Sequence, residues 1–340
     1  MKFSKALLKG YHYEFVKNLS WHPGKGFFGF INPGIYRLMK QYKPDAVLLF
    51  GYNHLSCWIA KWSAKRLGIP VIFKGEAAPA RDGPKWRMLL KKLYLARFFS
   101  EVPFFTYSCR KNADFFKYYG VRESQLYFMP CAVDNDKFEQ LRLQLDRKVV
   151  RANLAIEDNN VVVLYSGRLA AHKCPIVLLE AFKRIHTSCP ELRLIYIGEG
   201  DQREQLMSFL VQHNLTKKVV VAGFKSHDKV YEYYQSADIL VQPSLIDPSP
   251  KTVNEAMNFA LPVIVSDTVG TAGDLIIDGH NGYIFKQGSV EELANCLQKL
   301  ASDASLRKKL GMHALKTVLA WSFENDLVTI KRICKEIAMP

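Results

Sequence analysis

Short runs of apolar residues alternate along the chain with longer stretches in which apolar residues recur every three or four positions. The apolar runs cover residues 46–50, 70–73, 104–107, 126–129, 161–165, 192–197, 219–221, 239–241 and 263–265. The stretches between them predict helices over residues 53–67, 84–99, 110–119, 175–187, 201–214, 227–236 and 251–260. Runs that are apolar at nearly every position are typical of parallel strands buried on both faces. Their alternation with helices predicts βαβ units.

The charged segment 137–153 interrupts this alternation and divides the elements into two groups. With 340 residues, 49% of them hydrophobic, the chain is long enough for about two domains. We therefore predict an α/β protein with two Rossmann-like domains, residues 1–140 and 141–312, followed by terminal helices over residues 313–340.

The chain is strongly basic, with 47 Lys plus Arg against 32 Asp plus Glu and a formal net charge of +15. Such a charge favours nucleic acid, anionic lipid or phosphorylated substrates as partners. A nucleic-acid-binding surface is expected to expose aromatic and basic residues on its strands, whereas these strands are mostly aliphatic. Phosphorylated donors and lipids therefore explain the charge better than nucleic acid does. The seven cysteines form no CxxC pair, which is typical of reduced thiols in a cytoplasmic protein.

In parallel sheets, ligands bind beyond the carboxyl ends of the strands, so chemistry is expected in the loops that follow the apolar runs. The run 161–165 is followed by Ser166-Gly167-Arg168-Leu169, with Lys173 at the entry to the next helix. Gly167 allows a sharp turn, and the Arg168 and Lys173 cations are suited to hold a diphosphate from two sides. Two solvated cations beside a turn explain the same residues equally well.

Two further loops follow strands of the second domain. Gly198-Glu199-Gly200 is either a tight turn or a place where a ligand approaches the backbone. The segment from Pro243 to Pro250 leads into a helix that starts with Lys251, Thr252 and Val253. Free N–H groups of these three residues, together with the helix dipole, are suited to bind a phosphate.

Two carboxylates flank this last loop, Asp247 within it and Glu255 in the following helix. Carboxylates accept hydrogen bonds from sugar hydroxyls and stabilise positive charge at an anomeric carbon. The alternatives are that Asp247 is a turn residue before Pro248 and that Glu255 complements the helix dipole.

Together these motifs resemble the retaining glycosyltransferases of family 4. The residues that carry the resemblance are the Ser166–Leu169 loop with Lys173, the Gly198–Gly200 loop, Asp247-x7-Glu255-Ala256-Met257, and Leu261-Pro262-Val263-Ile264. Trp321-Ser322-Phe323 also resembles the segment before the family's final helix, which crosses back onto the first domain. The resemblance implies the GT-B fold, with two Rossmann-like domains and the active site between them. The family's usual motif is Glu-x7-Glu, so Asp247 is one methylene shorter than the family's first acid.

The resemblance also implies a donor and a set of roles. The donor is a nucleotide-diphosphate sugar, and neither a metal nor another cofactor is expected. Arg168 and Lys173 are expected to neutralise the diphosphate leaving group. The backbone around Phe224 and Lys225 is expected near the base. Glu255 is expected to hold the ribose or to act near the sugar–phosphate link, and Asp247 to hold the donor sugar.

The first domain resembles the family less well. Its run at residues 46–50 resembles a later strand of the family's domain, so about 70 or 80 residues of a full-length domain are expected to be missing. The family often has a His where Phe50 stands. His54 either replaces it on the acceptor side or decorates a helix start. Glu76, which follows the run 70–73, is a candidate acceptor contact.

Asp134-Asn135-Asp136 is a DxD sequence, which binds a divalent metal in another glycosyltransferase fold. Here it follows Pro130-Cys131-Ala132-Val133 and resembles the family's segment near the domain link. It is therefore interpreted as a turn or a helix cap rather than a metal site.

Residues 85–97 are apolar at helical spacing from Trp86, with cations at the other positions. This pattern fits a surface helix on an anionic membrane. It fits an ordinary Rossmann helix with a basic outer face equally well, so the sequence leaves a peripheral membrane contact open.

The sequence thus predicts a glycosyltransferase of polysaccharide or glycolipid biosynthesis that uses a lipid-linked or saccharide acceptor. The alternative is a remnant that binds nucleotide sugar without catalysis.

Overall fold

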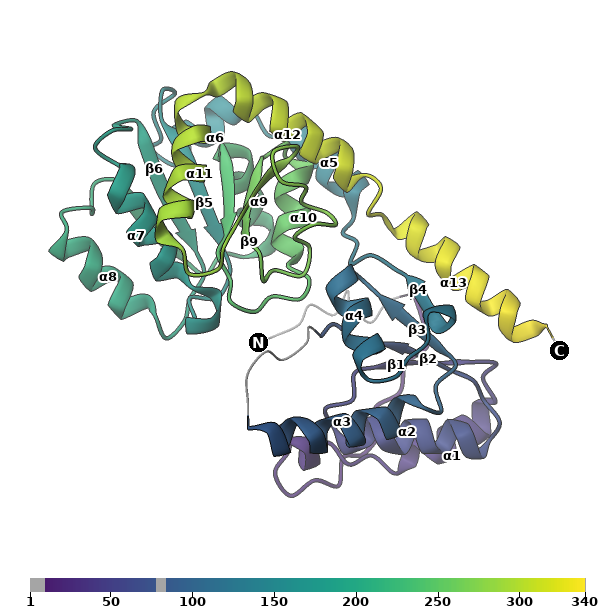
Figure 1. Cartoon of the computed structure of the whole chain (residues 1–340). Coiled ribbons are helices and arrows are strands. Elements are labelled where there is room, and N and C mark those ends of the chain that lie inside the picture. The colour runs from purple at the N-terminus through teal and green to yellow at the C-terminus, as the bar shows by residue number, and fades with distance from the viewer. Residues whose placement is uncertain (1–9, 78–83, 340) are drawn as a thin grey trace.

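The first parallel sheet contains four strands in the order β1-β2-β3-β4. Its strands are β1 (Val47–Phe50), β2 (Val71–Lys74), β3 (Phe104–Tyr107) and β4 (Leu126–Phe128). The computed structural model describes residues 10–77 and 84–339. In it this sheet forms the core of one lobe, and a second sheet forms the core of the other (Figure 1).

Four helices pack around the first sheet: α1 (Gly34–Tyr42), α2 (Leu55–Arg66), α3 (Lys85–Phe99) and α4 (Arg110–Tyr118). The core between them is unusually aromatic. Phe73 on β2 contacts the rings of Phe98, Phe99, Phe105 and Phe116, with centroids 5.3–5.8 Å apart. Aromatic pairs at such separations stabilise a core beyond their buried area, so a few large side chains fill this small domain.

The second sheet contains six parallel strands in the order β10-β9-β8-β5-β6-β7. They are β5 (Val161–Ser166), β6 (Leu192–Ile197), β7 (Val219–Gly223), β8 (Ile239–Gln242), β9 (Val263–Ser266) and β10 (Gly282–Phe285). The chain reverses its direction of winding between β5 and β8, which pair directly through Val163 and Ile239. In open α/β sheets, ligands bind outside the carboxyl ends of the strands at such a reversal.

Both faces of the second sheet are buried, which explains why its strands are apolar at nearly every position. Val163 and Tyr165 point to one face, while Val162 and Leu164 point to the other. The first face is covered by α7 (Pro175–Ile185), α8 (Arg203–Gln212) and α11 (Val290–Ser302). The second face is covered by α9 (His227–Ser236), α10 (Lys251–Asn258) and α12 (Ala304–Val318).

The charged segment expected to link the domains is helical. It forms α5 (Asn135–Gln144) and α6 (Arg147–Asn153), each capped by an aspartate, Asp134 and Asp146. Phe138 of α5 packs in the core of the second lobe. The predicted boundary after residue 140 therefore falls inside a helix that belongs to the second lobe.

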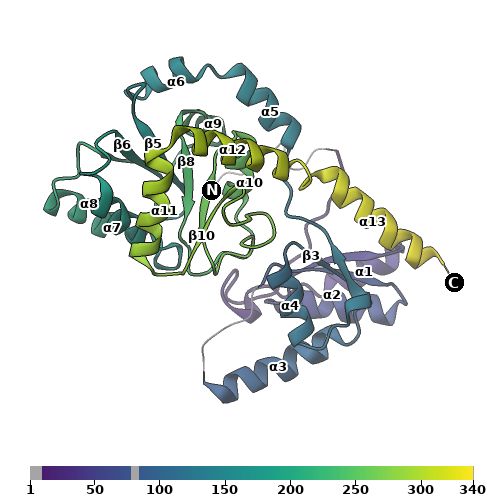
Figure 2. The same cartoon turned by 45° about the horizontal axis from the view of Figure 1, so that its top comes forward.

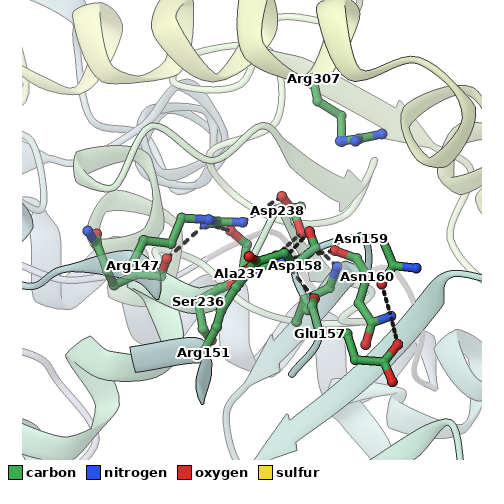
Figure 3. Close-up of polar contacts among 12 residues, drawn as sticks. Arg147, Arg151, Glu157, Asp158, Asn159, Asn160, Ser236, Ala237, Asp238 and Arg307 are labelled. Atoms are coloured by element: carbon green, nitrogen blue, oxygen red, sulfur yellow. Dashed lines mark hydrogen bonds and ion pairs between the residues drawn. The ribbon is translucent and has the colours of Figure 1, made fainter. Parts of the chain in front are cut away.

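An ion network joins α6 to the amino edge of the second sheet (Figure 3). The buried Arg151 guanidinium lies 2.6 Å from Asp238 Oδ2, and Arg147 lies 2.7 Å from the other oxygen of Asp238. The Asp238 carboxylate also accepts a hydrogen bond from the Val162 N–H at 2.8 Å. Burial, only partly offset by Asp238, lowers the pKa of Arg147. Moving α6 away would leave buried charges of this network unpaired, which is costly. The network therefore holds α6 at the edge of the sheet opposite the loops where the winding reverses.

The last helix, α13 (Phe323–Ala338), leaves the second lobe and runs along the first lobe (Figure 1, Figure 2). Ile333 packs with Ile72 and Tyr127, and the Thr329 hydroxyl donates to the Phe128 carbonyl oxygen at 2.7 Å. The terminal helix thus ties the two lobes together. None of the helices within the described parts of the chain is long and apolar enough to cross a membrane.

Candidate active site

The loop after β5 packs against the glycine-rich loop after β6 and is hydrogen-bonded to it. The Gly167 N–H donates to the Ile197 carbonyl oxygen at 3.0 Å, and the Leu169 N–H donates to the Glu199 carbonyl oxygen at 3.0 Å. A Cβ atom at Gly198 would lie 1.9 Å from the Gly167 carbonyl oxygen. The glycines of Gly198-Glu199-Gly200 are therefore needed for loop–loop contact. Of the two interpretations of this loop, a tight turn and a close approach of a ligand to the backbone, the structure supports the turn.

The two cations of the loop after β5 have different surroundings. Arg168 is exposed, and its guanidinium has no hydrogen-bond or ion-pair partner among the residues described by the structure. Lys173 is held: its Nζ lies 2.5 Å from Asp247 Oδ2, and about one fifth of its side chain is exposed. This ion pair joins the loop after β5 to the loop after β8, directly over the point where the sheet reverses.

Asp247 is fixed by further contacts of its side chain and backbone. Its Oδ2 accepts a hydrogen bond from Gln242 Nε2 at 3.1 Å, and its carbonyl oxygen accepts one from the Gly270 N–H at 2.9 Å. A Cβ atom at Gly270 would lie 1.7 Å from the Pro248 carbonyl oxygen. The loop after β9 thus packs so closely on the Asp247–Pro248 loop that only glycine fits.

Glu255 on α10 is oriented by a tyrosine from the neighbouring helix. The Tyr234 hydroxyl donates to Glu255 Oε2 at 2.8 Å and lies 3.4 Å from Ser166 Oγ at the end of β5. Burial, reinforced by the Glu255 carboxylate, raises the pKa of Tyr234 well above its usual value. Tyr234 therefore remains a neutral hydrogen-bond donor, and Glu255 is held near the carboxyl end of β5.

The start of α10 differs in part from the expectation of three free amides. The Val253 N–H donates to the Pro250 carbonyl oxygen at 3.0 Å, and the Val253 side chain is fully buried. The expectation that the Val253 amide is free is therefore wrong, because the chain closes a tight turn as the helix begins. Lys251 is exposed, and the buried Thr252 hydroxyl has no hydrogen-bond partner among the described residues.

The DxD sequence is a helix cap. The Asp134 carboxylate accepts a hydrogen bond from the Lys137 N–H at 3.1 Å and so caps the start of α5. Across the described residues, no group of three or more His, Cys, Asp or Glu side chains is placed to hold a metal ion.

The geometry of these loops agrees with the comparison with known families. A sequence model of the family described as Glycosyl transferases group 1 matches residues 146–317, half of the chain. The chain belongs to the glycosyl transferases group 1 family. The matched region starts at Asp146, directly before α6, and ends in α12, so it contains the whole second sheet and the loops after β5, β6, β8 and β9.

Members of the glycosyl transferases group 1 family resemble the chain at low identity. An uncharacterised glycosyltransferase of Methanocaldococcus jannaschii is 25% identical over 234 residues, covering 67% of this chain and 64% of that protein. The alpha-monoglucosyldiacylglycerol synthase of Acholeplasma laidlawii is 29% identical over 168 residues, covering 49% of this chain and 41% of that protein. The chain spans about half the length of the curated relatives it matches.

A solved structure shows the same fold. Anabaena Alr3699/HepE in complex with UDP superposes with a TM-score of 0.76 and 17% identity, covering 89% of this chain and 82% of that chain. The predicted α/β architecture with two parallel sheets of GT-B type is confirmed. Because the superposition covers most of both chains, it does not confirm the expected shortening of the first domain.

The last two candidate donor-binding residues, Phe224 and Lys225, directly follow β7. Phe224 is exposed, and Lys225 Nζ lies 5.9 Å from the centre of the Tyr233 ring. An exposed aromatic ring at the carboxyl edge of the sheet is suited to stack on a base. The placement of the base beside Phe224 and Lys225 stays a prediction.

On the acceptor side, the structure separates the two candidates. Glu76 is exposed after β2, and it lies with Lys251 and Ser249 of the second lobe around Cys131. Burial, followed by the nearby Glu76 charge, raises the pKa of Cys131. His54 instead contacts its own lobe: its Nδ1–H donates to the Gly26 carbonyl oxygen at 3.1 Å, and its ring lies 4.7 Å from that of Phe30. Phe50 is exposed at the end of β1.

The carboxyl edge of the first sheet faces the donor loops of the second. At the start of α4, which follows β3, the Cys109 thiol contacts the Pro248 carbonyl oxygen at 3.6 Å. Lys111 Nζ donates to the Val269 carbonyl oxygen at 2.7 Å, and Arg110 pairs with Asp274 at 3.1 Å. An acceptor bound at this edge of the first lobe would therefore lie beside the Asp247 loop.

The basic helix α3 exposes its apolar face. Trp86, Leu89, Leu90 and Leu93 lie one helical turn apart and are each 57–61% exposed, whereas Leu95, Phe98 and Phe99 at the other end are buried. An ordinary Rossmann helix would bury such a stripe against its sheet. The stripe is therefore exposed, and a peripheral membrane contact through it stays a prediction.

Tyr234 and Gln242 are candidate site residues that the sequence analysis missed. Tyr234 orients Glu255, and Gln242 holds Asp247. Gln242 is a polar residue at the end of the apolar run 239–241, which is a usable signal. Tyr234 lies 21 residues before Glu255, and nothing in the sequence indicates that the two meet.

Proposed function

We propose that the protein transfers a sugar from a nucleotide-diphosphate sugar to a lipid-linked or saccharide acceptor. The observation that carries this proposal is the Lys173–Asp247 ion pair over the β5–β8 reversal. A cation beside a carboxylate is suited to hold a diphosphate next to sugar hydroxyls, which supports the proposal. Membership of the glycosyl transferases group 1 family supports the same reaction class.

In this proposal, the bond between the anomeric carbon and the diphosphate oxygen breaks, and its electron pair leaves with the nucleoside diphosphate. Arg168 and Lys173 stabilise the departing charge by charge-assisted hydrogen bonds. The acceptor hydroxyl oxygen bonds to the anomeric carbon, and its proton passes to the departing diphosphate. Asp247 and Gln242 position the donor sugar, and Glu255, held by Tyr234, contacts the ribose or the sugar–phosphate link.

The resemblance to family 4 supports retention of anomeric configuration, and it is part of the proposal. The exposed apolar and basic face of α3 supports a lipid-linked acceptor at a membrane surface. The name of the Acholeplasma relative describes a glycosyl diacylglycerol product, which agrees with a glycolipid role. We therefore infer a place in polysaccharide or glycolipid biosynthesis.

The test measures release of nucleoside diphosphate from UDP- and GDP-sugars, with and without vesicles made from a bacterial polar lipid extract. The proposal predicts that one donor is consumed and that Glu255→Gln lowers the rate by about 100-fold. The anomeric proton of the product, followed by NMR, reports retention. Nucleotide binding without turnover of any donor would favour the nucleotide-sugar-binding remnant instead.

A further inference from the structure

An apolar groove lies on the first lobe between α3 and the loop after β1. Its cavity of about 450 Å³ is lined by Phe27, Tyr52, Asn53, Leu90, Lys91, Tyr94 and Leu95. Five of these seven residues are aromatic or aliphatic. A cleft of this size and lining is suited to an apolar ligand.

The groove continues the exposed stripe of α3. Leu90 belongs to both, because it lines the cavity and forms part of the face made by Trp86, Leu89 and Leu93. A hydrocarbon chain that follows the stripe therefore reaches the groove without crossing polar surface. The buried second half of α3 anchors the helix, so the stripe is held in a fixed position.

The groove also leads toward the proposed active site. Tyr52 and Asn53 follow β1 at the carboxyl edge of the first sheet. At the same edge, Cys109 and Lys111 contact the Pro248 and Val269 backbone of the donor lobe. One end of the groove is thus on α3, and the other is at the edge that faces the donor loops.

The charges around the groove select the kind of lipid. Residues 84–100 contain Lys85, Arg87, Lys91, Lys92 and Arg97 and no acidic residue. The cations flank the apolar stripe: Arg87 lies on one side of it and Lys85 and Lys92 on the other, as the helical period of 3.6 residues requires. Of these cations, Lys91 lines the groove itself; its Nζ lies 6.0 Å from the centre of the Phe115 ring, and it has no ion-pair partner among the described residues. Such surroundings fit an apolar chain with an anionic headgroup.

We propose that this groove binds the hydrocarbon chain of the acceptor, and that the acceptor is a lipid with a phosphate-bearing headgroup. The apolar lining takes up the chain, Lys91 faces the phosphate, and the stripe of α3 rests on the membrane from which the lipid is drawn. The inference rests on the proposed function in naming this lipid as the acceptor.

Two variants separate the groove from the stripe. Asn53→Trp fills the exposed mouth of the groove and leaves the stripe intact. The double variant Leu89→Gln/Leu93→Gln removes apolar surface from the stripe and leaves the groove lining unchanged. Neither variant alters a buried residue or a residue of the donor site, so binding of the nucleotide that the wild type binds, UDP or GDP, serves as the control for folding.

The experiment measures binding of farnesyl monophosphate, of farnesol, and of phosphatidylcholine vesicles with and without phosphatidylglycerol. The wild-type protein is expected to bind farnesyl monophosphate more tightly than farnesol, and to bind anionic vesicles more tightly than neutral ones. Asn53→Trp is expected to weaken farnesyl monophosphate binding by about tenfold while vesicle binding persists. The double variant is expected to weaken vesicle binding by about tenfold while farnesyl monophosphate binding persists.

Equal binding of farnesyl monophosphate by the wild type and Asn53→Trp would overturn the proposal. A stable dimer in light scattering that dissociates in the double variant would also overturn it, because the stripe would then be covered by a second copy. Failure to bind either UDP or GDP, with intact lipid binding, would contradict the proposed function alone. Intact nucleotide binding with no binding of farnesyl monophosphate would contradict the groove proposal alone.

Discussion

Lys173 and Asp247 form an ion pair at 2.5 Å between loops that are 74 residues apart in the chain. In the proposed reaction, the first residue binds the donor diphosphate and the second binds the donor sugar. The pair therefore sets the diphosphate site beside the sugar site before any donor is present. It also means that the Asp247 charge partly neutralises the cation that the diphosphate needs.

This relationship predicts opposite effects of Asp247→Asn on binding and on transfer. UDP, which lacks the sugar, is expected to bind about fivefold more tightly, because Lys173 loses its competing carboxylate. Sugar transfer is expected to fall by about 100-fold, because the sugar is no longer held by a charge. Calorimetry and a donor-turnover assay measure the two effects. Weaker UDP binding in the variant would show that Asp247 does not compete with the nucleotide.

Tyr234→Phe tests whether the tyrosine positions Glu255. The variant removes one hydrogen bond to a carboxylate, which typically stabilises by about 1.5–3 kcal/mol, and it frees the Glu255 side chain to rotate. We expect kcat/KM for the donor to fall about tenfold. Tyr233→Phe is the matched control, because the Tyr233 hydroxyl lies on the same helix and does not contact Glu255. Equal kinetics of the two variants would remove Tyr234 from the site.

Gly270→Ala tests the close packing behind the Asp247 loop. A Cβ atom at this position would lie 1.7 Å from the Pro248 carbonyl oxygen, so the loop must shift. We expect UDP-sugar turnover to fall by at least about tenfold. The control is Gly273→Ala in the same loop, where φ is +89° but the space for a Cβ atom is open. That control carries only the backbone cost of about 1–2 kcal/mol, and turnover is expected to persist.

Asp326 on α13 predicts a pH dependence of stability. Burial raises the pKa of this carboxyl to about 6, although nearby Lys74 opposes the shift, and one carboxyl oxygen is buried without a hydrogen-bond partner among the described residues. Because the folded chain binds this proton more tightly than the unfolded chain, the contribution to stability is fully present below pH of about 4. It is lost as the pH rises through about 6.

Asp326→Asn is therefore expected to stabilise the protein at pH 7 and above. The gain is on the order of 1 kcal/mol, since the side chain is only half-buried and solvent screens its charge. Urea unfolding at several pH values measures the difference, which should shrink toward zero below pH of about 4. A difference between variant and wild type that does not change with pH would contradict this account.

Much of the fold follows from the pattern of apolar residues. Every run and stretch named from the sequence coincides with a strand or helix, and the bounds agree within two residues. The strand β10 was missed because its four residues, Gly282–Phe285, carry too little pattern. The helices α5 and α6 were missed because their charged faces hide the few positions, such as Phe138 and Val150, that are buried.

The site was predicted only in part, because a strand-and-loop pattern indicates which loops meet but not which side chains touch. Arg168, Lys173, Asp247 and Glu255 all lie in loops or helix starts at one edge of the second sheet. The pairing of Lys173 with Asp247 depends on the reversal between β5 and β8, and sequence spacing does not reveal strand order. His54 is held within its own lobe by a contact with Gly26, 28 residues away in the chain, and sequence spacing does not reveal that contact.

The most direct test of the central claim is calorimetric titration of the purified protein with UDP and with GDP, alongside Arg168→Ala and Lys173→Ala. The account predicts micromolar binding of one of the two nucleotides, weakened in each variant by about 1–2 kcal/mol through loss of a charged hydrogen bond. If the folded protein binds neither nucleotide, the loops after β5 and β8 do not form a donor site, and the account is contradicted.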